Sequence, residues 1–224
     1  MLPGEERRRL VADVLAVGAP YGLVLAGGQA VQALGLVDRP GRELEVATES
    51  PAETGEIVAA VRAGLEARGW GVRVAEAEPL GALLAVTEPV TGEECAVQVV
   101  KEVLWRPAAD TELGPALSEE DAVGTRVRAL ADQGLAADLV DVHAVSDRWS
   151  RADLEELGRR HAGGVLDLAD LRARLDGAEW IDDRELTACG LDPAAVPGLR
   201  RWAQEWADDI GERLAESEAP DDGG

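Results

Sequence analysis

The stretch LVLAGGQAVQALGLVDRPGRELEVAT, from Leu23 to Thr48, decides the fold that the sequence predicts. A short apolar run of strand length ends at the glycine pair Gly27-Gly28, and a short amphipathic segment and a polar turn follow. A second strand then alternates acidic and apolar residues. On a strand, this spacing places Glu43 and Glu45 on one face and their apolar neighbours on the other.

Two acids on one strand face, next to a glycine turn, suit the binding of a metal-bound phosphate. Glycines let backbone N–H groups approach phosphate oxygens, and carboxylates hold hard cations that bridge to those oxygens. The alternative is a solvated polar face on an edge strand. The residues in this stretch leave both interpretations open.

The rest of the chain divides at the point where the residue spacing becomes helical. Before residue 118 the pattern predicts helices over 4–18 and 51–68, strands near 72–74, 80–87 and 95–100, a hairpin turn over 88–93, and a loop or short hairpin over 108–117. Capping patterns at Ser118, Ser150, Asp167 and Asp192 then predict successive helices. We therefore expect an α+β fold, with a mixed sheet and flanking helices over 1–117 and a helical domain over 118–214.

Composition and charge narrow the classes of partner. The net charge of −22 repels a phosphate backbone and so disfavours generic nucleic-acid binding. Residues 205–224 hold eight acids and one arginine, and 215–224 read as an acidic disordered tail. No apolar run reaches 18 residues, so no membrane segment is expected. Cys95 and Cys189 are far apart and lack a metal-binding spacing, which makes the cytoplasm the expected location.

Two segments resemble a known family. GGQAVQALGLVDRPGRELEVAT resembles the nucleotidyltransferase motif of the AbiEii/AbiGii abortive-infection toxin family, in which a glycine pair and short helix precede D-L-D. EEDAVGTRVRALADQGLAADLVDVHA, from Glu119 to Ala144, resembles that family's helical stretch with a lysine and R-D-x-x-D. The resemblance covers roughly residues 20–160 and implies a nucleotidyltransferase-like fold with its active site between two halves.

The resemblance also assigns roles to individual residues. Glu43 and Glu45 stand in place of D-L-D and would hold Mg²⁺, or Mn²⁺, as catalytic metal ligands. Gln98 stands where the family carries a third acid, and Asp138 could act as the base in its place. The remaining positions would contact the NTP, with Arg126 in place of the lysine: Gly27, Gly28, Gln29, Arg42 and Arg126.

The departures from the family pattern leave two functions open. One is metal-dependent transfer of a nucleotidyl group from an NTP to an unknown acceptor, RNA or protein, in a toxin-like role. The other is a pseudoenzyme that binds a nucleotide or a protein and has lost the chemistry, because Gln98 carries no charge and cannot act as a general base. His143, on the same predicted helix as Asp138, is a further candidate base, although a lone helical histidine is more often packed.

Overall fold

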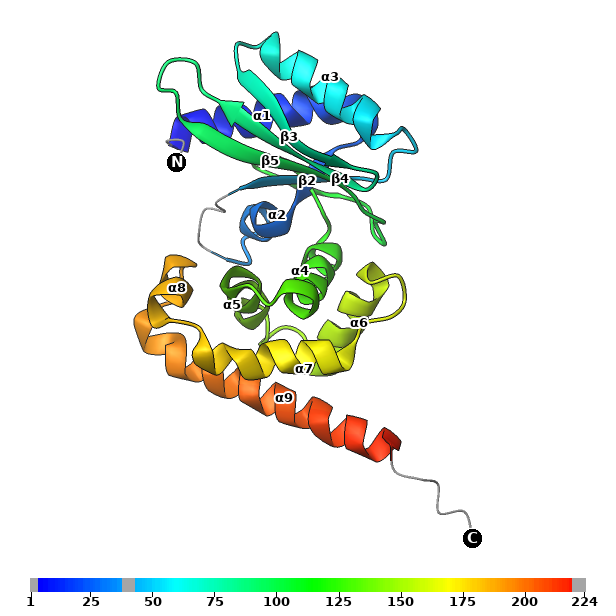
Figure 1. The fold of residues 1–224 in the computed structure, drawn as a ribbon, viewed down its shortest axis with the longest axis vertical. Helices are drawn as coiled ribbons and strands as arrows, with labels where there is room; N and C mark the ends of the chain where they lie inside the picture. The colour runs from blue at the N-terminus through cyan, green and yellow to red at the C-terminus, as the bar shows by residue number, and fades with distance from the viewer. Residues whose placement is uncertain (1–3, 38–42, 219–224) are drawn as a thin grey trace. The chain divides into compact units, whose positions relative to one another are not determined.

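A computed structural model describes residues 4–37 and 43–218 (Figure 1). Contacts within the chain divide it into two compact units, Met1–Ala122 and Val123–Gly224. The division falls in the first turns of helix α4, close to Ser118, where the sequence predicts the change from mixed to helical structure. Asp121 explains why it lies slightly later. Its buried carboxylate accepts hydrogen bonds from the backbone N–H groups of Trp105 and Arg106, which holds the start of α4 to the first unit.

The first unit is built on a mixed sheet. Its described strands occur in the order β3-β4-β5-β2-β1-β7-β6. The pairs β2/β5 and β1/β7 are parallel, and the other pairs are antiparallel. The strands are β1 Val24–Ala26, β2 Leu44–Thr48, β3 Gly71–Glu78, β4 Gly81–Thr87, β5 Glu94–Lys101, β6 Ala109–Thr111 and β7 Gly114–Ala116.

The helices α1 (Gly4–Gly18) and α3 (Thr54–Glu66) lie together on one side of this sheet (Figure 1). Their apolar residues recur at helical spacing and meet the inward residues of alternating strands in a single core. Val46 and Val99, on neighbouring strands, are both buried there. The third helix, α2 (Gly27–Ala33), follows β1 directly and packs against β1 and β2.

The second unit is helical. Its helices are α5 Ala136–Ala144, α6 Arg151–His161, α7 Leu168–Asp176, α8 Asp183–Ala188 and α9 Val196–Glu218, preceded by α4 Glu119–Gln133 across the division. The predicted caps are present. Ser150 and Asp153 form a reciprocal capping box, and Asp167 caps α7 through the backbone N–H groups of its first turn. Trp206 of α9 is fully buried, so it belongs to the core of this unit.

The predicted α+β fold with a helical C-terminal part is confirmed. Of the loop or short hairpin predicted over 108–117, the hairpin is present, because β6 and β7 pair antiparallel, and β7 also pairs with β1. Two details differ from the prediction. Asp192 caps a 3-10 turn, Pro193–Ala195, that precedes α9. Helix α9 continues to Glu218, so the first four residues of the expected tail are helical, and the rest lie outside the described residues.

No helix in the described ranges is long and apolar enough to cross a membrane.

Candidate functional site

The turn between β1 and α2 brings the glycine pair against an acid. Gly27 has φ +56°, a left-handed conformation that favours glycine. Ala26 pairs with Glu45 across the β1/β2 ladder, so the next residue lies beside the Glu45 side chain. A Cβ atom on Gly27 would lie 2.2 Å from Glu45 Oε2. The carboxylate therefore occupies the space that the missing side chain leaves.

Gln98 lies next to Glu45 on the neighbouring strand. The two residues are register partners in the parallel β2/β5 pair, which places their side chains on the same face of the sheet. On its other side Gln98 pairs with Leu83 of β4. The Gln98 side chain is half-buried, and its amide has no hydrogen-bond partner among the residues that the structure describes. Thus Glu45, Gln98 and the glycine turn come together.

Glu43 has a different position from Glu45. Strand β2 begins at Leu44, so Glu43 lies on the bend before the strand and is exposed. Its backbone carbonyl accepts a hydrogen bond of 2.9 Å from Arg7 Nη2 of α1. Of the two acids, only Glu45 therefore lies within the paired strand. The alternation that the sequence predicts for both acids does not extend to Glu43.

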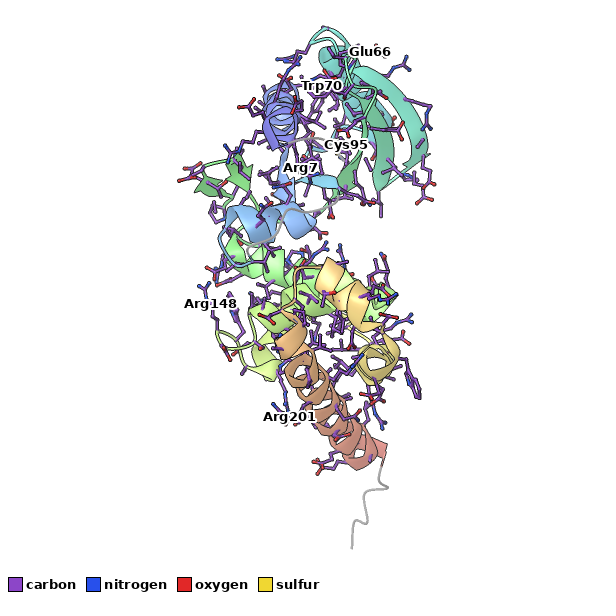
Figure 2. The ribbon with its side chains drawn as sticks, turned by 90° about the vertical axis from the view of Figure 1, so that its left-hand side faces the viewer. Arg7, Glu66, Trp70, Cys95, Arg148 and Arg201 are labelled. Atoms are coloured by element: carbon purple, nitrogen blue, oxygen red, sulfur yellow. The ribbon has the colours of Figure 1, made fainter. Side chains whose placement is uncertain are left out.

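Arg7 is the residue that sequence reasoning missed at this site. Besides the Glu43 carbonyl, its Nη2 atom donates to Gln29 Oε1 over 3.1 Å, so Arg7 joins α1, the start of α2 and the start of β2 (Figure 2). The only sequence signal was a run of three arginines on an amphipathic helix, which is typical of a solvated face. Arg7 and Glu43 are also close enough to affect the pKa of Cys95. Burial raises the pKa of that thiol, the charge of Arg7 opposes the rise, and Glu43 adds to it.

Gln29, one of the predicted nucleotide contacts, makes hydrogen bonds within the protein. Gln29 is buried, and its amide is used at both ends: the oxygen accepts from Arg7, and the nitrogen donates to Gln32 Oε1 over 3.0 Å. Arg42 lies outside the described residues. Gly28 is the second residue of α2, and no side chain caps the start of this helix at Ala26.

The acids of this region fit a metal that is held together with a substrate. Within residues 4–37 and 43–218, no group of three or more His, Cys, Asp or Glu side chains gathers in a form that could hold a metal ion. Mg²⁺ is often bound by one or two carboxylates together with substrate phosphates and water. Glu45, which lies in the space left by Gly27, matches this shared binding by carboxylate and substrate.

In the second unit, Arg126 and Asp138 form an ion pair with each other. Arg126 Nη1 of α4 lies 2.7 Å from Asp138 Oδ1 of α5, and the two side chains are 14% and 4% exposed. Asp141, three residues further along α5, is buried as well. Arg126 and Asp138, which belong to the second segment that resembles the family, thus pair with each other inside this unit.

His143 packs against the core of the same unit. Its ring makes an edge-on contact with Trp202 of α9, with 5.1 Å between centroids. Burial lowers the pKa of His143, and Asp147 partly opposes this shift. This environment is that of a packed helical histidine, the more common of the two roles considered from the sequence.

Searches with the sequence alone return no relative: no known family profile matches it, and no curated protein does. The fold does have solved counterparts. MenT4, a nucleotidyltransferase toxin from Mycobacterium tuberculosis, aligns with a TM-score of 0.62 at 18% identity, over 92% of this chain and 82% of that one.

Two structures from Helicobacter pylori align over nearly the full length of both chains. The protein JHP933 has a TM-score of 0.52 at 15% identity and covers 96% of this chain and 97% of its own. A candidate nucleotidyltransferase has a TM-score of 0.53 at 15% identity and covers 97% and 100%. This chain has a nucleotidyltransferase-like fold. At these identities the likeness is one of fold alone.

Proposed function

We propose that this chain is a metal-dependent nucleotidyltransferase that uses an NTP, of the AbiEii/AbiGii type that the sequence resembles. The observation that carries the proposal is the Glu45 carboxylate in the space left by Gly27, within a fold shared with a nucleotidyltransferase toxin. A glycine turn beside a metal-binding carboxylate is what the phosphates of a nucleotide require.

Each residue of the glycine turn has a distinct role in this proposal. The backbone N–H groups at Gly27 and Gly28 would bind phosphate oxygens, which glycine favours because neither residue adds a side chain of its own. Glu45 would hold Mg²⁺ or Mn²⁺, with Glu43 as the second carboxylate. When bound, the metal ion would act as a Lewis acid and neutralise charge on the phosphates.

Arg126 and Asp138 are assigned by the resemblance rather than by their contacts. Arg126 would stabilise negative charge on the phosphates, and Asp138 would accept the proton of the acceptor hydroxyl. Within the second unit the two side chains form an ion pair with each other. Neither role is available in full while the pair is intact.

The second candidate is a nucleotide- or protein-binding module without transfer activity. Gln98 favours it, because a neutral amide lies beside Glu45 at the position where the resembling family carries an acid. An amide can offer an oxygen to a metal ion, but it adds no charge and cannot take a proton. Under this candidate the glycine turn would still bind phosphate.

The acceptor in the first candidate is RNA or a protein, and the physiological role is that of a toxin. Generic binding to nucleic acid is not part of the proposal, since the net charge of −22 opposes it. The cytoplasmic location stays a prediction.

Titration calorimetry with each NTP and Mg²⁺ or Mn²⁺, followed by a labelled-nucleotide transfer assay, separates these candidates. Glu45→Gln tests the site, and Glu78→Gln, which removes an exposed acid from the edge strand β3 of the same sheet, is the matched control. Transfer that Glu45→Gln abolishes and Glu78→Gln preserves supports the enzyme. Binding without transfer supports the module, and absence of NTP binding overturns both.

A further inference from the structure

A pocket lies in the first unit, between α1, α2 and the turn that joins β6 to β7. Its volume is about 500 Å³, and neither Gly27 nor Glu45 lines it. Val11 and Leu113 contribute apolar surface, while Arg7, Arg8 and Gln32 contribute polar groups. Pockets of this size that combine apolar walls with a few converging polar groups are typical of small-molecule sites.

A chain of hydrogen bonds determines which polar atoms this pocket can offer. Arg7 donates to the Gln29 oxygen, and the Gln29 nitrogen donates to the Gln32 oxygen. Because the Gln32 oxygen is used in this way, its NH₂ group is the part of the amide left for a ligand. The two guanidinium groups have donors only. The polar groups of Arg7, Arg8 and Gln32 therefore favour a ligand rich in acceptors.

The charges point to an anion with more than one negative charge. Two arginines line the pocket in a protein with a net charge of −22, and among the described lining residues Glu112, on the β6–β7 turn, is the one acid. Glu112 and Arg8 are both exposed, so solvent screens both charges, whereas Arg7 is half-buried and is screened less. A phosphate dianion would be neutralised by two guanidinium groups and could take the Gln32 amide as a further donor.

We infer that this pocket binds a small molecule with a phosphate monoester and an apolar portion. Arg8 and Gln32 hold the phosphate together with Arg7, and Val11 and Leu113 contact the apolar portion. The binding itself does not depend on the function proposed above.

Arg7 connects this pocket to the glycine turn. It holds the Glu43 carbonyl at the start of β2 and the side chain of Gln29, which is two residues beyond Gly27. A phosphate that accepts a hydrogen bond from Arg7 would change the strength of the hydrogen bonds that Arg7 makes to these two segments. An effect of this pocket on the glycine turn would rest on the proposed function, so the experiment below measures ligand binding to the pocket alone.

The test is a calorimetric titration of the full chain, without metal or nucleotide, with phenyl phosphate, inorganic phosphate and benzoate. Phenyl phosphate should bind more tightly than inorganic phosphate, because it also fills the apolar part, and more tightly than the monoanion benzoate. Arg8→Gln should weaken phenyl phosphate binding roughly 10- to 100-fold, the usual range for losing a charged hydrogen bond. Glu112→Gln should strengthen it a few-fold, roughly, since it removes a repulsive charge.

Two controls locate the binding. Arg201→Gln removes another exposed arginine, on α9 (Figure 2), and should leave the affinity unchanged. Glu45→Gln should also leave it unchanged, because Glu45 does not line the pocket. No phenyl phosphate binding at millimolar concentration, or binding that Arg8→Gln leaves intact, would overturn the inference. A changed affinity in Glu45→Gln would also overturn it, because without metal the removal of this carboxylate would raise the affinity of a phosphate bound at the glycine turn.

Discussion

The two halves of the family resemblance have opposite environments in this protein. In the first unit, Glu45 and Gln98 lie half-buried side by side, and the Gln98 amide has no hydrogen-bond partner in the part of the chain that the structure describes. In the second unit, Arg126 and Asp138 are nearly fully buried and bonded to each other. Residues that resemble one catalytic pattern thus lie on a sheet face in one unit and form a buried ion pair in the other.

This difference separates residues that act on ligands from residues that maintain the fold. Breaking a buried ion pair leaves an uncompensated charge, which is costly for stability. Changing a half-buried polar residue on a sheet face changes stability little, but it alters the charge that a ligand meets. Substitutions in the ion pair of the second unit should therefore change the free energy of unfolding. Substitutions on the sheet face of the first unit should change ligand binding or transfer.

The largest expected effect is on the ion pair. Arg126→Met should lower the free energy of unfolding of the second unit by about 3–5 kcal/mol, because Asp138 is left buried without its partner. Urea unfolding, followed by the fluorescence of the buried tryptophan in this unit, measures it. Arg151→Met, which removes an exposed pair with Glu205, is the matched control and should cost less than about 1 kcal/mol.

The double variant Arg126→Met/Asp138→Leu sharpens the same test. Replacing both charges with apolar groups should recover most of the lost stability, since no unpaired charge remains. If the single variant is as stable as the wild type and instead loses NTP binding, Arg126 acts on a ligand, and the contrast between the two units disappears.

The next largest effect is on transfer activity. Gln98→Asp should raise nucleotidyl transfer by about 10²–10³, the scale on which one well-placed electrostatic group acts. The added carboxylate would lie beside Glu45, so it could hold a metal ion or take a proton. Labelled-nucleotide transfer is compared with Ala96→Asp, which places the same charge two residues away on the same strand face. Robust wild-type transfer that Gln98→Asp leaves unchanged would contradict this assignment.

A smaller effect concerns metal binding without nucleotide. Two glutamates and a neutral amide offer less charge than three aspartates, so Mg²⁺ should bind weakly until phosphates complete its coordination. Calorimetry with Mg²⁺ and then with Mg²⁺ plus NTP should show binding only in the second case. Submillimolar Mg²⁺ affinity in the absence of nucleotide, lost in Glu45→Gln, would show that the acids alone form a metal site.

The smallest effect is a pH dependence in the second unit. Burial lowers the pKa of His143 in the folded chain, so the unfolded chain binds the proton more readily. Stability from this group is therefore full above pH about 6.5 and is lost as the pH falls through the folded pKa. Urea midpoints between pH 5 and pH 8 for wild type and His143→Gln measure it. An unchanged slope in the variant would mean that other groups carry the acid sensitivity.

Much of the secondary structure could be predicted because it depends on near neighbours. Ser150 and Asp153 are three residues apart, and their capping box forms whatever the rest of the chain does. The alternation in β5 is likewise local and was correctly read. The short hairpin of β6 and β7 is one of the two alternatives that the sequence predicts for 108–117. The parallel pairing of β7 with β1 could not be predicted, because β1 lies about ninety residues earlier in the chain. Such pairing has no local signal.

By itself, the sequence determined the α+β class, the change to helices near Ser118 and the glycine turn followed by acids. These follow from capping, spacing and glycine conformation, which act over a few residues. The tertiary structure alone decided that Glu45 faces Gly27 and Gln98, that Arg7 joins three elements, and that Arg126 pairs with Asp138. Those contacts depend on strand register and helix packing, whose free energies come from residues far apart in the chain.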